Sequence, residues 1–125
     1  MFRFETLEIW KLATEYVDII YRITKGFPKE ELFGLTSQLR RASVSISTNI
    51  AEGSGAVSTR DYKNYLDIAV KSALETTSLL YVVARQRYIS EEVRGELYKD
   101  AELIIRKTRA FKASLDKQLA ISTKQ

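Results

Sequence analysis

Apolar residues recur along most of the chain at steps of three and four positions, separated by charged and polar residues. This spacing collects the apolar side chains on one face of an α-helix. The first segment with this pattern contains Leu7, Ile9, Trp10, Ala13, Val17, Ile20 and Tyr21. It predicts a helix over residues 6–25. The sequence Gly26-Phe27-Pro28 predicts its end, because glycine suits the position after a helix and proline resists continuing one.

Three further segments have the same period and predict helices over residues 36–53, 59–87 and 91–118. The expected N-terminal caps of these helices are Thr36, Ser58 and Ser90. Their hydroxyl groups can accept hydrogen bonds from the free N–H groups of a first helical turn. The last residues, 121–125, are expected to fray.

Four amphipathic helices joined by mostly short connections pack most simply as an antiparallel up-down-up-down four-helix bundle. The composition agrees with this all-α prediction, because five glycines and one proline are few for a β-sandwich or barrel, in which turns recur about every 8–12 residues. With 125 residues, of which 45% are hydrophobic and 29% charged, the chain has the size and composition of one globular domain, predicted to span residues 1–125.

The chain contains neither cysteine nor histidine. Their absence excludes disulfides, metal sites built on these ligands, and the Ser-His and Cys-His pairs of nucleophilic catalysis. We therefore expect no cofactor, no metal site and no catalytic residue. The sequence shows no signal-peptide pattern and no run of about 18 apolar residues, so we expect a cytoplasmic protein without a membrane partner. The formal net charge of +4 permits binding to nucleic acid.

The predicted helix over residues 36–53 carries a polar stripe beside its apolar one, formed by Gln38, Arg41, Ser45, Asn49 and Glu52. Their spacing of three and four residues places all five on one face. A solvated face usually carries Lys and Glu rather than Ser and Asn, which are poor helix formers. Ser72 and Glu75 form a similar pattern on the next helix. We predict that the two stripes form a hydrogen-bonded network in a packed seam, either within the bundle or between subunits.

An enzymatic alternative would use Glu52 and Glu75 as a carboxylate pair for acid–base chemistry. The sequence gives it little support, because Glu52-Gly53-Ser54-Gly55 lacks the glycine pattern and the preceding strand of a phosphate-binding loop. A di-iron site in a bundle would also need Glu-x-x-His pairs, which this chain cannot supply.

Four motifs span residues 7–90: Leu7-x-x-Trp10-Lys11-x-Ala13, Phe27-Pro28-x-Glu30-x-x-x-Gly34-Leu35-Thr36-x-Gln38-Leu39-Arg40-Arg41-Ala42, Ser45-Ile46-x-x-Asn49-Ile50-Ala51-Glu52-Gly53 and Ser72-x-x-Glu75. Together they resemble the four-helix bundle family of bacterial 23S rRNA intervening-sequence proteins (S23 ribosomal protein-like), to which the accessory variability protein of diversity-generating retroelements is similar. The last predicted helix matches that family only as a generic amphipathic helix.

The resemblance implies a four-helix bundle that assembles as a ring-shaped homopentamer and is not an enzyme. The retroelement relative binds nucleic acid and a reverse transcriptase, so the resemblance also implies nucleic acid or a nucleic-acid-processing protein as a partner. None of the family's shared positions is carried over as catalytic. In this chain they correspond to Gln38, Arg40, Arg41, Ser45, Asn49, Glu52, Gly53, Ser72 and Glu75.

One end of an up-down bundle gathers the starts of the first and third helices with the ends of the second and fourth. The basic residues predicted to contact nucleic acid there are Arg60, Lys63, Arg106, Lys107, Arg109, Lys112 and Lys117. Without a groove-reading motif, the first functional hypothesis is binding of RNA or DNA through phosphates, with no sequence preference. The same cations can instead simply complement the dipole of a helix end. The second hypothesis is a protein–protein adaptor with no nucleic-acid role.

Overall fold

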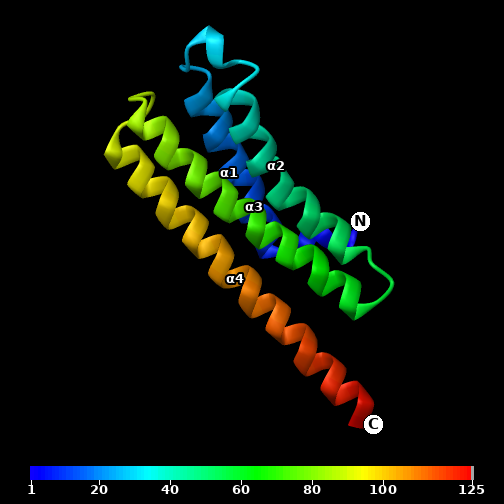
Figure 1. The fold of residues 1–125 in the computed structure, drawn as a ribbon. Coiled ribbons are helices and arrows are strands. Elements are labelled where there is room, and N and C mark those ends of the chain that lie inside the picture. Colours follow the sequence, from blue (N-terminus) through cyan, green and yellow to red (C-terminus); the bar gives the residue numbers. More distant parts are fainter. Residues whose placement is uncertain (125) are drawn as a thin grey trace.

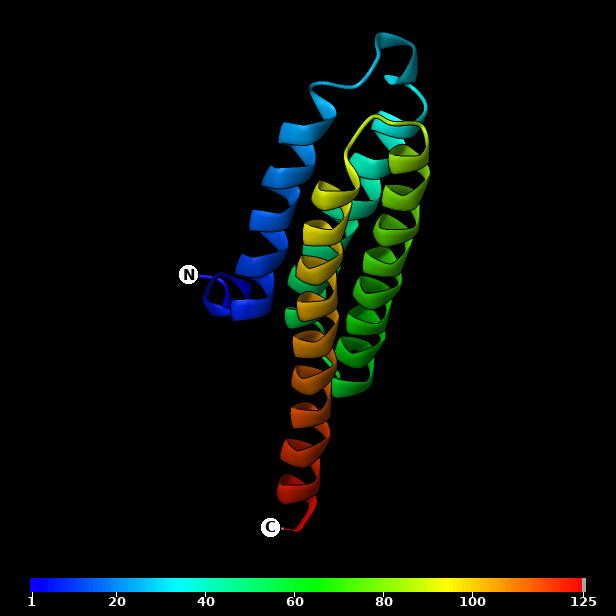
Figure 2. The same ribbon diagram turned by 90° about the vertical axis from the view of Figure 1, so that its left-hand side faces the viewer.

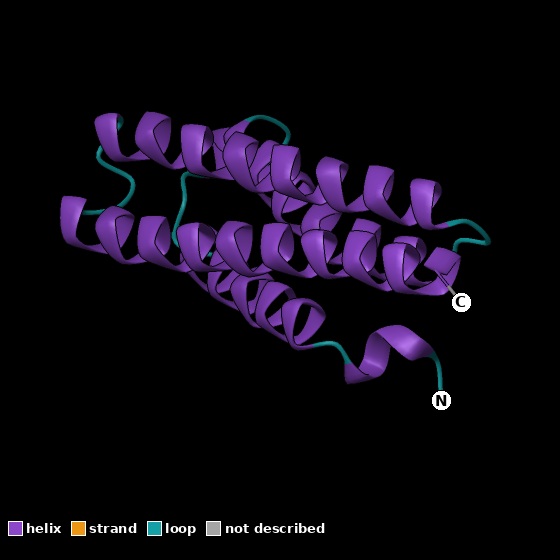
Figure 3. Cartoon of the chain, turned by 90° about the horizontal axis from the view of Figure 1, so that it is seen from below, coloured by secondary structure: helices purple, strands orange, loops and turns teal. Residues whose placement is uncertain are grey.

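The computed structural model describes residues 1–124 of the chain, with side chains described through residue 117. Its elements, in chain order, are the 3₁₀ segment η1 (Arg3–Thr6), α1 (Glu8–Thr24), the 3₁₀ segment η2 (Lys29–Glu31), α2 (Leu35–Ser54), α3 (Thr59–Arg85) and α4 (Glu91–Lys124). Consecutive long helices run in opposite directions (Figure 1), and no strand occurs in the described part of the chain (Figure 3). The predicted antiparallel four-helix bundle is confirmed.

The four helices do not pack equally closely around the bundle. The most extensive contact is between α2 and α3, followed by those of α3 with α4 and of α1 with α2. The contact between α1 and α4 is much smaller, and Figure 2 shows α1 diverging from α4 along its length. The α1–α4 seam therefore lies on the opposite side of the bundle from the tight α2–α3 seam.

The apolar stripes of all four helices meet in one core. Each helix contributes side chains that are almost fully buried, such as Ile20 from α1, Ile46 from α2, Leu66 from α3 and Leu97 from α4. Burial of one such side chain contributes about 1.5–3 kcal/mol relative to leaving it exposed. The helical spacing seen in the sequence thus marks the core directly.

The N-terminal end of the bundle differs from the sequence prediction. Instead of entering α1 at residue 6, the chain first forms η1, because the Glu5 carboxylate accepts a hydrogen bond from the backbone N–H of Phe2 at 2.7 Å. Leu7 is then extended, and α1 begins at Glu8. A short 3₁₀ turn, η2, follows Pro28.

Two of the three predicted caps are confirmed. The Ser58 and Ser90 hydroxyls accept hydrogen bonds from the backbone N–H groups of Asp61 and Val93, both at 3.1 Å. The prediction for Thr36 is wrong, because α2 already starts at Leu35 and Thr36 is a buried helical residue.

The start of α2 is satisfied from the preceding turn. The backbone N–H of Leu35 donates to the Glu31 carboxylate at 3.4 Å, so the helix needs no hydroxyl cap of its own. The same carboxylate accepts a hydrogen bond from the Tyr88 hydroxyl at 3.0 Å. Glu31 therefore links the η2 turn to the turn between α3 and α4.

The ends of α3 and α4 also differ from the predicted ones. The third helix stops at Arg85, and Arg87 takes a left-handed conformation (φ 64°) that reverses the chain before Ser90. The fourth helix passes the predicted end at residue 118 and reaches Lys124, because neither glycine nor proline follows Gly95. The predicted fraying of residues 121–125 is not seen in this helical segment, and Gln125 lies outside the described residues. None of the helices within residues 1–124 combines the length and the hydropathy that crossing a bilayer requires.

Candidate assembly and nucleic-acid interfaces

Three residues of the predicted polar network come together between α2 and α3. The hydroxyl groups of Ser45 and Ser72 lie 2.8 Å apart and share a hydrogen bond across the seam. The Asn49 side-chain amide donates to the Ser45 backbone oxygen at 2.8 Å and to the Ser45 hydroxyl at 3.0 Å. Ser72 is only 7% exposed, so this bond lies inside the packed seam.

The longer side chains of the predicted network lie elsewhere. Gln38, Arg41, Glu52 and Glu75 are all exposed, and none takes part in the side-chain hydrogen bonds or ion pairs formed within residues 1–117. The helices approach closely enough for serine and asparagine to meet, and the longer groups extend outward. These four residues form the polar outer face of α2 and α3.

The close approach of α2 and α3 depends on Gly53. A Cβ atom at this position would lie 2.8 Å from the Cβ of Tyr65 and 3.0 Å from a ring carbon of Tyr62. Both distances are shorter than a normal van der Waals contact, so only glycine allows this helix spacing. The sequence signal for this role was a glycine at the end of the apolar period of the predicted helix over residues 36–53, and helical spacing alone does not reveal the close contact.

A second residue whose role the sequence did not reveal is Arg40. Its Nε–H donates a hydrogen bond to the Thr24 hydroxyl at 2.8 Å, and its guanidinium lies 4.5 Å from the centre of the Tyr21 ring. Arg40 thus joins the end of α1 to α2, and its role is structural.

Exposed apolar side chains adjoin the outer face of α2. Phe33 is 94% exposed and Leu32 is half exposed in the turn before the helix, and Val44 is partly exposed on it. These residues line a shallow open groove together with Arg41 and Glu52. Large exposed aromatic residues beside polar groups are typical of surfaces that bind another protein or another copy.

The starts of the first and third helices and the ends of the second and fourth lie at one end of the bundle, as predicted. The N-terminus lies beside the end of α2, and the start of α3 lies against the C-terminal part of α4 (Figure 1). The Arg3 guanidinium stacks 5.1 Å from the centre of the Tyr62 ring. Burial, opposed by the charge of Arg3, raises the pKa of Tyr62.

The structure divides the seven predicted nucleic-acid-binding cations into two groups. Three form ion pairs: Lys63 with Asp116 at 2.5 Å, Lys112 with Asp67 at 2.8 Å, and Lys107 with Glu8. Because these pairs remain partly exposed, each contributes little to stability.

The other four cations are exposed and belong to none of the ion pairs found among residues 1–117: Arg60, Arg106, Arg109 and Lys117.

A surface hollow at this end brings several of the predicted residues together. It has a volume of about 290 Å³ and is lined by Thr59, Arg60, Lys63, Asn64, Asp67 and Lys112. Because Lys63 and Lys112 pair with Asp116 and Asp67, the positive charge of the lining comes mainly from Arg60, and the threonine hydroxyl and the asparagine amide add neutral hydrogen-bond donors. This donor set matches the chemistry of a phosphate group.

The alternative carboxylate pair of the sequence analysis does not lie in a buried site. Glu52 and Glu75 are both exposed to solvent. Among the described residues, no three acidic side chains come together as a group that could hold a metal ion.

The fold and its surfaces define an all-α, antiparallel four-helix bundle with a polar α2–α3 seam and a basic end. The family model of the 23S rRNA-intervening sequence protein matches residues 5–110, and the chain belongs to this family. The match extends into α4, beyond the motifs that suggested it, and the predicted membership of the 23S rRNA intervening-sequence family is confirmed.

A solved relative has the same architecture. It is the crystal structure of a protein of unknown function from the S23 ribosomal protein family of Bacteroides thetaiotaomicron VPI-5482, with a TM-score of 0.77 and 28% sequence identity. The alignment covers 83% of the present chain and 97% of that one. No protein with a curated description matches the chain.

Proposed function

We propose that this protein is a non-enzymatic, homo-oligomeric bundle that binds nucleic acid through the basic end without reading its sequence. The observation that carries the proposal is the hollow at the start of α3, where Arg60, Lys63 and Lys112 converge with two neutral donors. Phosphate contacts of this kind supply affinity and no base discrimination.

The charges around the hollow support the proposal. The ion pairs of Lys63 and Lys112 hold these side chains in place, so two of the cations are already ordered before a phosphate arrives. Arg60 is the exposed cation of the hollow, and Arg109, which lies outside it on α4, is also exposed and is available as a further contact along a nucleic-acid backbone. Exposed cations on several copies of the chain would add their contributions through avidity.

Self-assembly is the second part of the proposal. The outer face of α2 and α3 presents Gln38, Arg41, Glu52 and Glu75 beside apolar groups, the composition expected of an interface between subunits. Arginine and glutamate on the same face can pair with each other across two copies.

The nucleic-acid part is tested by fluorescence anisotropy with labelled single-stranded RNA, single-stranded DNA and duplex DNA of mixed sequence. All three should bind, and the affinity should fall steeply between about 50 and 200 mM salt. The double variant Arg60→Gln, Arg109→Gln should weaken binding and reduce the salt slope by about 1–2, one phosphate contact for each residue.

A matched control removes two exposed cations from the other end of the bundle. Lys25→Gln, Arg85→Gln changes the net charge equally and should bind much more like the unmodified protein. If both double variants lose affinity to the same extent, net charge rather than the basic end is responsible. Absence of measurable RNA and DNA binding at low salt would refute the nucleic-acid part altogether.

Assembly is tested separately by multi-angle light scattering. One chain has a mass of 14.3 kDa, so five copies would give about 72 kDa. Arg41→Glu should lower the measured mass, and Arg22→Glu, a charge reversal on the exposed surface of α1, should leave it unchanged. A mass of 14.3 kDa for the unmodified protein would rule out the homo-oligomer.

A further inference from the structure

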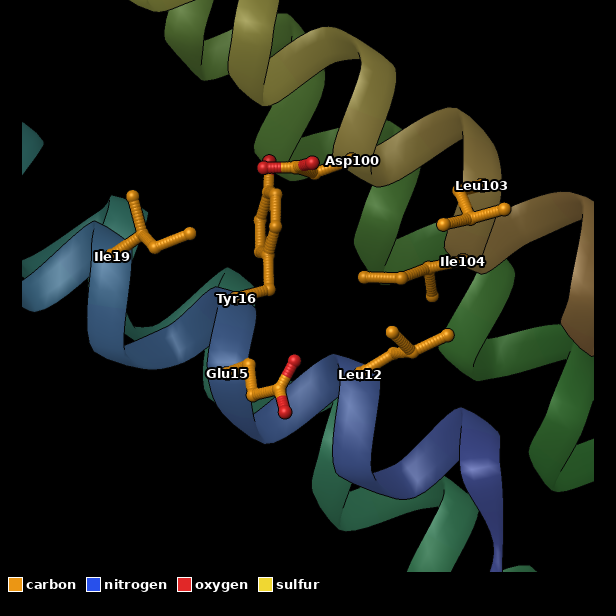
Figure 4. Close-up of a pocket in the computed structure, with 7 residues that line it drawn as sticks. All are labelled: Leu12, Glu15, Tyr16, Ile19, Asp100, Leu103 and Ile104. Atoms are coloured by element: carbon orange, nitrogen blue, oxygen red, sulfur yellow. The ribbon is translucent and has the colours of Figure 1, made fainter.

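The loosely closed seam between α1 and α4 contains a cleft of about 100 Å³. Its walls are apolar and come from both helices, with Leu12 and Ile19 on one side and Leu103 and Ile104 on the other (Figure 4). Ile104 belongs to the core, and the other three remain partly exposed. Apolar side chains therefore line a surface that no element of the described chain covers.

Two carboxylates border this apolar cleft. Glu15 lies on the α1 side and Asp100 on the α4 side, and both are exposed. Neither belongs to an ion pair with a cation of residues 1–117. Partial burial, with the nearby charge of Glu96, raises the pKa of Asp100, as expected for a carboxylate without a compensating cation.

A buried hydroxyl group faces the same cleft. Tyr16 is 1% exposed, and its ring extends from α1 to Asp100, as Figure 4 shows. Its hydroxyl donates to the backbone oxygen of Leu97 at 3.4 Å. This distance is longer than the usual range of about 2.5–3.0 Å for a hydrogen bond from a hydroxyl group. The phenolic oxygen, which lines the cleft, can still accept one hydrogen bond.

We propose that the α1–α4 cleft is a docking site for an amphipathic helix of a partner protein, with one lysine of that helix inserted between Glu15 and Asp100. The lysine stem would lie along Leu12 and Leu103, and its ammonium group would donate to the two carboxylates and to the Tyr16 oxygen.

The geometry and charge of the cleft favour this occupant. A groove between two helices accepts a third helix through apolar anchors of that helix, and Leu12, Glu15 and Ile19 share one face of α1 along the cleft. The cleft is small, so it takes one side chain rather than the body of the partner. An ammonium group has three donors around one nitrogen and suits three separate acceptors, whereas the planar arginine fork suits a single carboxylate. Nucleic acid is a poor occupant because the border is acidic.

This site is independent of the proposed function. It lies on the side of the bundle away from the α2–α3 face, so a partner helix could dock with the subunit interface occupied. Its test uses no nucleic acid, and the outcome does not depend on whether RNA or DNA binds the basic end.

The test is a methyl-detected NMR titration of the full chain with isotope-labelled leucine and isoleucine. The probe is a helical peptide of about 15 residues with leucines along one face and a single lysine in the middle of that same face. Two reference peptides have glutamate in place of lysine, or the same composition in scrambled order. We expect the methyl signals of Leu12, Ile19 and Leu103 to shift with the first peptide only, and those of Ile68 on the exposed face of α3 to stay in place.

Variants identify the lysine site itself. Asp100→Asn keeps the size and the exposed position of the side chain, so the variant should fold normally. Its affinity for the lysine peptide should be roughly tenfold lower than that of the unmodified protein. Glu102→Gln, an exposed carboxylate on another face of α4, should leave the affinity unchanged.

Three results would overturn the proposal. The first is an Asp100→Asn protein that binds the peptide as tightly as the unmodified one. The second is a glutamate or scrambled peptide that binds equally well. The third is a concentration-dependent shift of the same methyl signals without peptide, which would identify a second copy of the chain as the occupant.

Discussion

The substitution Gly53→Ala is expected to destabilise the protein even though alanine is the better helix former. Gly53 is the penultimate residue of α2, so alanine should contribute up to about 1 kcal/mol through helix propensity. Against this, the new Cβ would lie 2.8 Å from the Cβ of Tyr65. A Cβ atom cannot rotate away from its backbone, so α2 and α3 must separate or the Tyr65 segment must shift.

Overpacking of this kind usually costs about 1–3 kcal/mol. The cost exceeds the gain in propensity, so we expect a net loss of about 1–2 kcal/mol in the free energy of unfolding. For a chain of this length such a loss corresponds to a decrease in Tm of roughly 3–8 °C. The α2–α3 contact is the most extensive in the bundle, which gives the strain no inexpensive route of relief.

Gly95 provides the matched control. It is also helical, but a Cβ added there meets no heavy atom within 4 Å. Gly95→Ala should therefore stabilise the protein by about 0.5–1 kcal/mol through propensity alone. Both variants are compared with the unmodified chain by urea denaturation followed by circular dichroism, at one protomer concentration because assembly would shift the midpoint. A Gly53→Ala protein as stable as the unmodified one would refute the close-packing argument.

Three further predictions follow from individual contacts. Ser72→Ala and Ser45→Ala should each lower the free energy of unfolding by about 0.5–1.5 kcal/mol, because each leaves the other hydroxyl without this partner. The double variant should cost less than the sum of the two, because it leaves neither hydroxyl behind without its partner, and additive losses in urea denaturation would contradict this. Above about pH 10 the unfolded chain binds fewer protons than the folded one, because burial raises the pKa of Tyr16, so stability should fall with rising pH. In Tyr16→Phe this decline should be shallower, and an unchanged decline would exclude Tyr16 as its source. Arg40→Lys should cost about 1 kcal/mol because lysine lacks the Nε–H donated to Thr24, and thermal unfolding at the unmodified Tm would argue against the contact.

Much of the fold could be predicted because its main determinant is local. The residues of an apolar stripe identify their own helix, and residues such as Ile46 and Ile50 are buried where the period placed them. Caps are equally local when the hydroxyl stands directly before the first turn, as at Ser58 and Ser90. Thr36 failed as a cap because α2 already begins at Leu35, where the preceding turn brings the Glu31 carboxylate to the Leu35 N–H, and the Gln38 N–H already donates to the Gly34 oxygen.

The candidate sites were less predictable because they depend on which helices meet and how closely. Helical spacing placed Ser45 and Arg41 on the same stripe, yet only the serine reaches α3. The ion pairs Lys63–Asp116 and Lys112–Asp67 join residues from α3 and α4, and no local pattern indicates which cations they neutralise.

The sequence by itself determined the number of helices, their amphipathic faces, most of their ends and the family, because each depends on residues close together along the chain or on whole motifs. The tertiary structure alone decided that Gly53 fixes the α2–α3 spacing, that Ser45, Asn49 and Ser72 meet while Gln38 and Glu52 face outward, and that the α1–α4 seam stays open beside Tyr16 and Asp100. These features depend on distances between helices, and the periodicity of a single helix contains no information about its distance from a neighbour.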